Sequence, residues 1–220
     1  MERVVCILIG YLFGLFETSY IIGRAHGIDI RDYGSGNAGT TNMMRTLGKG
    51  WGALTFIGDG LKPVFAALVS WLIFRKTYAD IWPLLCVYTG FGAVLGHSFP
   101  FYLGFRGGKG IATTGGTTLA LHPALCLLAI IGFCIGFFST GYVSVGSLIV
   151  AGGFLVESVI FGQLGWLGMT QRYLNELYVI VAIIAGLDFY RHRGNIDRLR
   201  KGEERKSGLL DKSKKKPKKK

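Results

Sequence analysis

Long apolar runs recur along the whole chain and constrain its fold more than any other feature of the sequence. They cover residues 4–22, 51–74, 81–101, 124–138, 145–161 and 174–189, with a shorter run at 111–121. A helix of about 20 apolar residues spans the hydrocarbon core of a bilayer. Half of the residues are hydrophobic and 17% are charged, a balance typical of membrane proteins. We therefore predict an all-α, polytopic integral membrane protein with about seven transmembrane helices, some of them short.

The positive charge of the chain is concentrated toward its C-terminal end. The net charge is +12, and much of the excess lies in the lysine-rich stretch 212–220. A polybasic segment beside a membrane helix attracts anionic headgroups, at about 1 kcal/mol per cation near the surface. We interpret it as a lipid-facing tail and predict no nucleic-acid partner. The predicted organisation is a membrane-embedded domain over residues 1–202 and a basic, disordered tail over residues 203–220.

Charge and the number of crossings predict the topology. The tail is the most basic segment, so we expect it to be cytoplasmic. If residues 111–121 and 124–138 each cross the membrane, or together form a re-entrant hairpin, the N-terminus lies outside and the polar loops share the cytoplasmic side. A single crossing would place the loops on opposite sides. The short, threonine-rich piece that ends at His122-Pro123 favours the first arrangement, because proline disfavours a continuing helix.

Two glycine-rich polar segments lie between the apolar runs. Residues 33–45 read YGSGNAGTTNMMR, and residues 104–110 read GFRGGKG. Glycines let the backbone turn its N–H groups toward a ligand, while serine, threonine and asparagine add donors and acceptors. Arg45 supplies a planar, permanently charged fork, and Lys109 supplies an ammonium group. The two segments therefore indicate an anionic ligand that carries phosphate.

Structural interpretations of the same residues stay open. Gly110 follows Lys109 where a nucleotide-binding P-loop requires serine or threonine, which argues against ATP hydrolysis. Arg45 and Lys109 also suit the role of membrane anchors, and His97 that of a hydrogen-bonding residue instead of a proton carrier. Polar residues that also suit capping or backbone bonding are Ser35, Asn37, Thr41, Asn42 and Ser144.

Other polar residues in the apolar runs receive structural interpretations. Asp59 and Lys62 lie three residues apart, share one face of a helix, and are interpreted as a buried ion pair. Glu157 has no evident partner. The cysteines fall in apolar runs without a C-x-x-C pair, so the sequence predicts neither a disulfide nor a metal site.

Three stretches resemble the motifs of one enzyme family. Residues 34–45, residues 96–113 and the segment His192-Arg-Gly-Asn-Ile196 are similar to those of the bacterial acyl-phosphate:glycerol-3-phosphate acyltransferases (PlsY-type). The resemblance extends from the first apolar run to Gly202. It implies a multi-pass enzyme of the bacterial inner membrane with a cytoplasmic active site and no cofactor. The implied reaction transfers an acyl group from acyl phosphate to the sn-1 hydroxyl of glycerol 3-phosphate. Lysophosphatidic acid and phosphate would be the products, in the first acylation step of phospholipid synthesis.

The resemblance also implies the roles of individual residues. Those assigned to catalysis are Ser35, Arg45, Lys109, Ser144, His192 and Asn195. Those assigned to substrate binding are Gly36, Asn37, Gly39, Thr41, Asn42, His97, Gly107, Gly108 and Gly110. Both substrates carry phosphate, which accounts for two cationic loops, although the sequence leaves open which loop binds which phosphate.

Three further questions stay open on the sequence. The general base is His97, His192 or an oxygen of a substrate phosphate, and we favour the phosphate. His192 and Asp197 have the H-x-x-x-x-D spacing of unrelated thioester-dependent acyltransferases, which we interpret as accidental. The alternative function is a membrane transporter for an organic phosphate. Membrane lipids are expected partners, and the sequence does not indicate an oligomeric state.

Overall fold

The computed structural model describes residues 1–207. Every secondary-structure element in this range is a helix, and the range contains no strand. The α-helices are α1 (Glu2–Gly14), α2 (Thr18–Ala25), α3 (Thr40–Thr46), α4 (Lys49–Phe74), α5 (Trp82–Ser98), α6 (Ile111–Leu121), α7 (Pro123–Thr140), α8 (Val143–Gln163), α9 (Gln171–Arg191) and α10 (Arg193–Arg200). In the described part of the chain, six segments are long and apolar enough to cross a membrane, namely Glu2–Ala25, Lys49–Phe74, Ala79–Leu103, Pro123–Thr140, Val143–Gln163 and Gln171–Arg191. The prediction of an all-α, polytopic membrane protein is confirmed.

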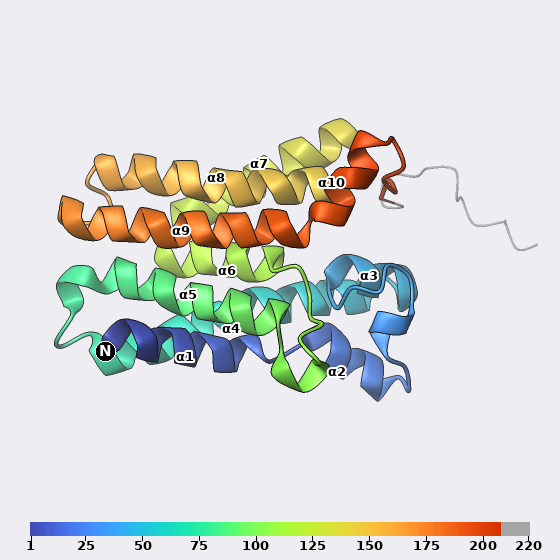
Figure 1. The fold of residues 1–220 in the computed structure, drawn as a ribbon, viewed down its shortest axis with the longest axis horizontal. Coiled ribbons are helices and arrows are strands. Elements are labelled where there is room, and N and C mark those ends of the chain that lie inside the picture. The colour runs from blue at the N-terminus through green and yellow to red at the C-terminus, as the bar shows by residue number, and fades with distance from the viewer. Residues whose placement is uncertain (208–220) are drawn as a thin grey trace, which may run out of the picture.

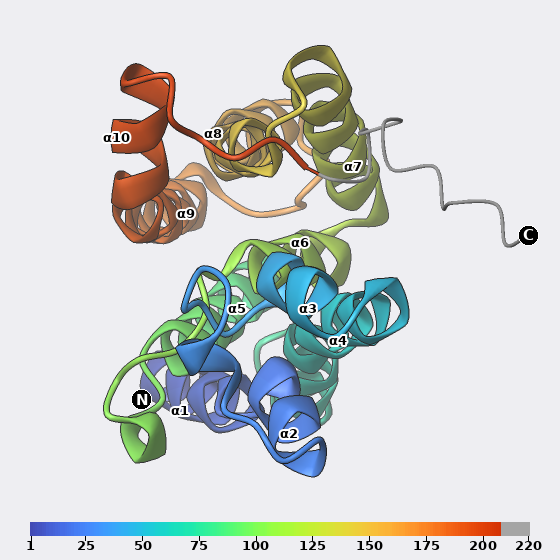
Figure 2. The same cartoon turned by 90° about the vertical axis from the view of Figure 1, so that its right-hand side faces the viewer.

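The helices run roughly parallel and form a bundle with two distinct ends. Figure 1 shows α2, α3, α10 and the loop between α5 and α6 at one end, on the right of the view, which we call the motif end. Viewed from that end (Figure 2), α7, α8 and α9 form one group and α1 to α5 another, with α6 between them. A buried apolar cluster joins the two groups, with Val87 of α5, Phe154 of α8 and Leu177 of α9 completely buried.

Helix α6 is the short member of the bundle. Its 11 residues reach about 16 Å at 1.5 Å per residue, well below the thickness of a hydrocarbon core of about 30 Å. The chain reverses at His122, whose ring accepts a hydrogen bond from the Ala124 amide, and Pro123 begins α7. Helix α7 then returns to the motif end (Figure 1). Residues 111–140 therefore form a hairpin that begins and ends at the same end of the bundle.

The prediction of one continuous helix over residues 4–22 is wrong in one respect, because the helix is interrupted between Gly14 and Thr18. Glu17 lies in this break and is completely buried. Lys62 of α4 donates hydrogen bonds to the carbonyls of Gly14 and Phe16, at 3.2 and 3.0 Å. It thereby pairs groups that the end of a helix leaves without partners. The predicted ion pair between Lys62 and Asp59 is present at 3.4 Å.

The remaining differences from the sequence-based reading lie at the motif end. The loop expected over residues 23–50 contains a short 3₁₀ turn, Ile30–Asp32, and helix α3. Beyond the last predicted apolar run, the chain continues as α10. The predicted tail over residues 203–220 lies outside the described residues from 208 onward, whereas residues 203–207 return toward the bundle, where the Ser207 amide donates to the Gly141 carbonyl at 2.9 Å.

Candidate active site

A cavity of about 850 Å³ opens at the motif end and gathers residues from distant parts of the sequence. Its walls come from the loop before α3, the loop before α6, the first turn of α8, and α10. Every residue assigned to catalysis lines it, and so does every residue assigned to substrate binding except Gly108. Phe56 of α4 and Phe133 of α7 add apolar surface. The cavity therefore offers a cationic, hydrogen-bonding wall next to an apolar one.

Asn42 organises the first glycine-rich loop from beneath. Its side chain is buried and accepts from the Ser35 amide at 2.8 Å, while its NH₂ group donates to the carbonyls of Ile30 and Tyr33 at 3.0 Å each. Gly34 has φ +62°, and a Cβ there would lie 2.2 Å from the Asn42 side-chain oxygen. Both N–H donors of Asn42 are thus used within the loop. Asn42 shapes the loop that presents Ser35 and leaves no donor for a ligand.

The second glycine-rich loop is clamped from two sides. The amides of Gly107 and Gly108 donate to the carbonyls of Ser98 and His97, at 3.3 and 3.0 Å. Their own carbonyls accept from the guanidinium of Arg191, with distances between 2.8 and 3.1 Å. The sequence-based expectation that these two glycines offer their N–H groups to phosphate is therefore wrong, because those groups are already paired. The cations that this loop contributes to the cavity lining are Arg106 and Lys109.

Lys109 is the cation at the centre of the site. It donates a short hydrogen bond to the side-chain oxygen of Asn195. Burial lowers the pKa of Lys109 to about 8; the carboxylate of Glu204 opposes this shift, and the cations of Arg198, Arg191 and Arg45 add to it. A partly desolvated ammonium interacts strongly with an anion, because little water screens it.

Glu204 connects the residues around Lys109, although the sequence placed it in the tail. Its carboxylate accepts from the Ser144 hydroxyl at 3.1 Å, the Asn195 amide at 2.7 Å and the Arg198 guanidinium at 2.7 Å. Burial raises the pKa of Glu204, and these hydrogen bonds outweigh it, so the net pKa is lowered. Glu204 thus extends the site beyond the predicted boundary at residue 202. Its acidic character within a basic segment was the available sequence signal.

His192 presents a neutral imidazole to the cavity. Its Nδ1 lies 2.8 Å from the Asp188 carbonyl oxygen. Because a carbonyl only accepts, Nδ1 carries the hydrogen and Nε2 keeps a free lone pair. Burial and the positive charge of Lys109 lower the pKa of His192 to about 4. Nε2 therefore serves as a hydrogen-bond acceptor at neutral pH.

Three side chains that support this site were not singled out from the sequence. Arg191 clamps the second loop, and Asp188 accepts a hydrogen bond from Thr114 of α6 at 2.8 Å. Glu17 lies 2.9 Å from the ring of His97. Their partners are distant in the sequence, so spacing gave no signal for these contacts.

Comparisons with known proteins identify the family. A family model described as glycerol-3-phosphate acyltransferase matches residues 4–202. The chain belongs to this family. The glycerol-3-phosphate acyltransferase of Clostridioides difficile (strain 630) is 41% identical over 208 residues, covering 93% of this chain and 95% of that protein. The one from Rubrobacter xylanophilus is 38% identical over 208 residues, covering 94% and 96%.

Solved structures of the glycerol-3-phosphate acyltransferase family have the same fold. The crystal structure of PlsY, an integral membrane glycerol 3-phosphate acyltransferase, in its glycerol 3-phosphate form superimposes with a TM-score of 0.81 at 32% identity. The superposition covers 98% of this chain and 100% of the PlsY chain. A lysophosphatidic acid form of PlsY gives a TM-score of 0.78. The family resemblance predicted from the three motifs is confirmed.

Proposed function

We propose that the protein transfers an acyl group from acyl phosphate to the sn-1 hydroxyl of glycerol 3-phosphate. The observation that carries this proposal is the convergence of two cationic loops on one cavity, with Arg45 from the first and Lys109 from the second. Both substrates carry a phosphate group, so two cationic positions suit the reaction. Acyl phosphate is already activated, and the transfer needs no metal, thiol nucleophile or nucleotide.

The proposed chemistry is a direct displacement. The hydroxyl oxygen of glycerol 3-phosphate bonds to the acyl carbon, and the bond between that carbon and the phosphate oxygen breaks. The phosphate leaves with the electron pair, and the products are lysophosphatidic acid and inorganic phosphate. Holding the two substrates together and stabilising the developing negative charge supplies most of the rate. We assign charge stabilisation to Lys109 and Arg45.

The hydroxyl proton goes to a substrate phosphate oxygen. A general base works best when its pKa is near the operating pH. The pKa of His192 is lowered to about 4, which makes its ring a weak base at neutral pH. A phosphate monoester has a second pKa of about 6. We therefore assign His192 Nε2 to accepting a hydrogen bond from the hydroxyl and so orienting it, and the proton to the phosphate.

The proposed setting is the cytoplasmic face of the bacterial inner membrane. The motif end carries the cationic loops and α10, whereas the opposite end carries few cations. The positive-inside tendency places the more basic end in the cytoplasm. We assign the acyl chain to the apolar surface of Phe56 and Phe133, which line the cavity.

The test is acyl transfer by the purified protein with labelled glycerol 3-phosphate and no added metal. The donors to compare are palmitoyl phosphate, palmitoyl-CoA and palmitoyl acyl-carrier protein. We expect labelled lysophosphatidic acid from palmitoyl phosphate alone. Product from a thioester would instead favour the His192 and Asp197 pair as the catalytic unit, since Asp197 also lines the cavity.

A transporter for an organic phosphate is the second candidate. It predicts binding and flux of glycerol 3-phosphate without any acylated product. Among the described residues, those lining the cavity include none from the loops 75–81 and 164–170 at the opposite end of the bundle. A site that is open at one end suits an enzyme better than a path through both leaflets.

A further inference from the structure

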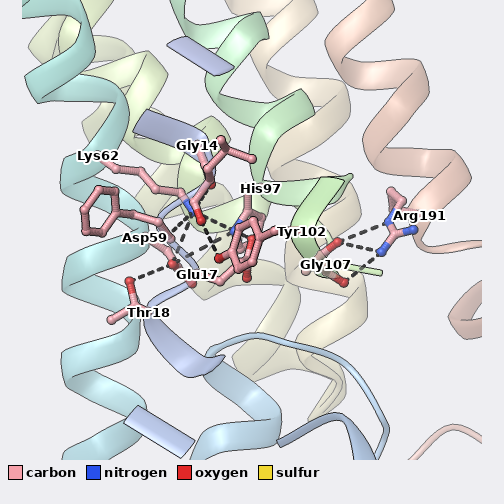
Figure 3. Close-up of polar contacts among 12 residues, drawn as sticks. Gly14, Glu17, Thr18, Asp59, Lys62, His97, Tyr102, Gly107 and Arg191 are labelled. Atoms are coloured by element: carbon pink, nitrogen blue, oxygen red, sulfur yellow. Dashed lines mark hydrogen bonds and ion pairs between the residues drawn. The ribbon is translucent and has the colours of Figure 1, made fainter. Parts of the chain in front are cut away.

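A buried cluster of ionisable side chains lies directly behind the second glycine-rich loop. Its members are Glu17 from the break between α1 and α2, Asp59 and Lys62 from α4, and His97 from α5. Each is at most 5% exposed. Figure 3 shows these four side chains converging, with Arg191 reaching Gly107 on the other side of the loop. Burying such groups is costly unless they are paired, so their arrangement requires a physical reason.

Half of the cluster closes the break between α1 and α2. Lys62 donates to the carbonyls of Gly14 and Phe16 there. Asp59 accepts from the hydroxyl of Thr18, the first residue of α2, at 2.9 Å. These contacts account for Asp59 and Lys62 as structural residues. They leave Glu17 and His97 unexplained.

The Nδ1 edge of the His97 ring faces both Glu17 and Lys62. His97 Nδ1 lies 2.9 Å from the Glu17 carboxylate and 2.7 Å from Lys62 Nζ. The Glu17 carboxyl is completely buried, and among the described residues its ion-pair contact is with His97. Contacts at one ring nitrogen turn the opposite edge of the ring toward Gly108.

The opposite edge of His97 packs against the loop that carries Lys109. A Cβ placed on Gly108 would lie 2.1 Å from His97 Nε2 and 2.5 Å from the Ala38 carbonyl oxygen. The Gly108 amide also donates to the His97 carbonyl. Gly108 is therefore held between His97 on one side and Arg191 on the other. The next residue is Lys109, so the place of its ammonium group depends on this packing.

We propose that Glu17 is a positioning residue for acyl transfer, acting through His97 and Gly108 on Lys109. Glu17 holds the His97 ring, the ring holds Gly108, and the loop then places the Lys109 ammonium in the cavity. The inference rests on the proposed function, because a rate is its first readout. Glu17 does not line the cavity, so its effect on the rate passes through the loop.

The test compares Glu17→Gln with Glu157→Gln in the full-length protein. Glu157 is a half-buried carboxyl on α8, outside the cavity lining, and its Oε2 has no hydrogen-bond donor among the described residues. We expect Glu17→Gln to lower kcat/KM by about tenfold to a hundredfold, because small displacements of a catalytic group cost rates of that order. Glu157→Gln should stay within about twofold of the wild type, as a change away from the site. Equal rates in the two variants would overturn the proposal.

A second variant separates positioning from stability. His97→Asn keeps an amide near Glu17 and Lys62 but removes the ring edge that packs on Gly108. We expect His97→Asn to show the same loss of kcat/KM as Glu17→Gln and to have a thermal midpoint of unfolding close to that of the wild type. The double variant should be no slower than the worse single variant, because the two residues act as one unit. If the double variant lost kcat/KM by the product of the two single losses, the two residues would act independently and the proposal would be wrong. A lower thermal midpoint with unchanged kcat/KM would show that the cluster is only structural.

A third readout does not depend on turnover. The rate at which acetic anhydride modifies Lys109, followed by mass spectrometry of its peptide, reports how the loop holds the ammonium group. We expect a several-fold faster modification in Glu17→Gln and His97→Asn and no change in Glu157→Gln, since a loosened loop exposes the amine. If the wild type transfers no acyl group, the proposed function fails and this readout still decides the inference. Unchanged reactivity in all variants would overturn it.

Discussion

Among single residues, Lys109 titrates in a range that an assay reaches. Burial lowers its pKa to about 8, so the ammonium is lost as pH rises through that value. We expect kcat/KM of the wild type to fall by about tenfold per pH unit above about pH 8, because this parameter follows the free enzyme. Lys109→Arg keeps its charge at every accessible pH, and its alkaline fall should disappear. The measurement is kcat/KM for glycerol 3-phosphate from about pH 6 to about pH 10.

The same residue allows loss of activity to be distinguished from unfolding. An unfolded lysine has a pKa of about 10.4, so between about pH 8 and that value the unfolded chain binds more protons than the folded one. Lys109 therefore contributes a stability that increases with pH in this window. Activity should fall while the thermal midpoint does not. If kcat/KM fell equally at alkaline pH in the wild type and in Lys109→Arg, the fall could not be assigned to the titration of Lys109.

Which residues were predictable depended on where their partners lie. Ser35, Arg45 and Lys109 stand in local motifs, so their residue types and spacing indicated a phosphate site. Asn42 has the same polar character, yet its donors are taken up by Ile30 and Tyr33 in the fold. Glu17 could not be recognised, because a buried carboxylate is tolerated only beside partners that the fold brings from α4 and α5. Local sequence patterns carry no information on such contacts.

Among the elements, α1 and α5 pack closely against each other at their glycines. A Cβ on Gly10 would lie 1.9 Å from the Thr89 carbonyl oxygen, and one on Gly92 would lie 2.1 Å from that of Ile7. Each helix has a second glycine one turn on, Gly14 and Gly96, so both carry the G-x-x-x-G spacing that allows close approach. This contact holds the end of α5, and with it His97, against the break in α1.

The prediction for this contact is a loss of stability from one methyl group. Gly92→Ala should lower the free energy of unfolding by about 1–3 kcal/mol, the usual cost of overpacking. Gly186→Ala is the matched control on α9, where a Cβ meets nothing within 4 Å. The control should leave the protein as stable or more stable, because alanine favours helix over glycine. Thermal unfolding of both variants in detergent provides the measurement, and equal midpoints would contradict the packing argument.

The elements themselves were predictable to different degrees. Apolar runs of membrane length marked α4, α5, α7, α8 and α9, since their length and composition are local properties. The break at residues 15–17 interrupts an otherwise apolar run and depends on Lys62, a residue of another helix. Helix α3 has 7 residues and lies in a polar loop. Neither feature has a periodic pattern long enough to detect.

At the scale of the whole molecule, every cationic loop of the candidate site lies at the motif end. This follows from the hairpin of α6 and α7, which returns the chain to the motif end before α8 begins (Figure 1). Had residues 111–140 crossed the bundle only once, Ser144 would lie far from Lys109 and the cavity could not form. The hairpin therefore allows a short chain to assemble one site from segments on both of its halves.

The charges of the bundle predict its orientation in the membrane, and this prediction is open to direct measurement. In a background with Cys6, Cys86, Cys126 and Cys134 replaced by alanine, Lys76→Cys would mark the opposite end and Ser139→Cys the motif end. We expect a membrane-impermeant maleimide to label Lys76→Cys in intact bacterial cells, and Ser139→Cys only after permeabilisation. The reason is that the loop with Arg75 and Lys76 is the less basic side. The reverse pattern would place the cavity outside the cell, away from the phosphorylated metabolites of the cytoplasm, and would contradict a role in lipid synthesis from glycerol 3-phosphate.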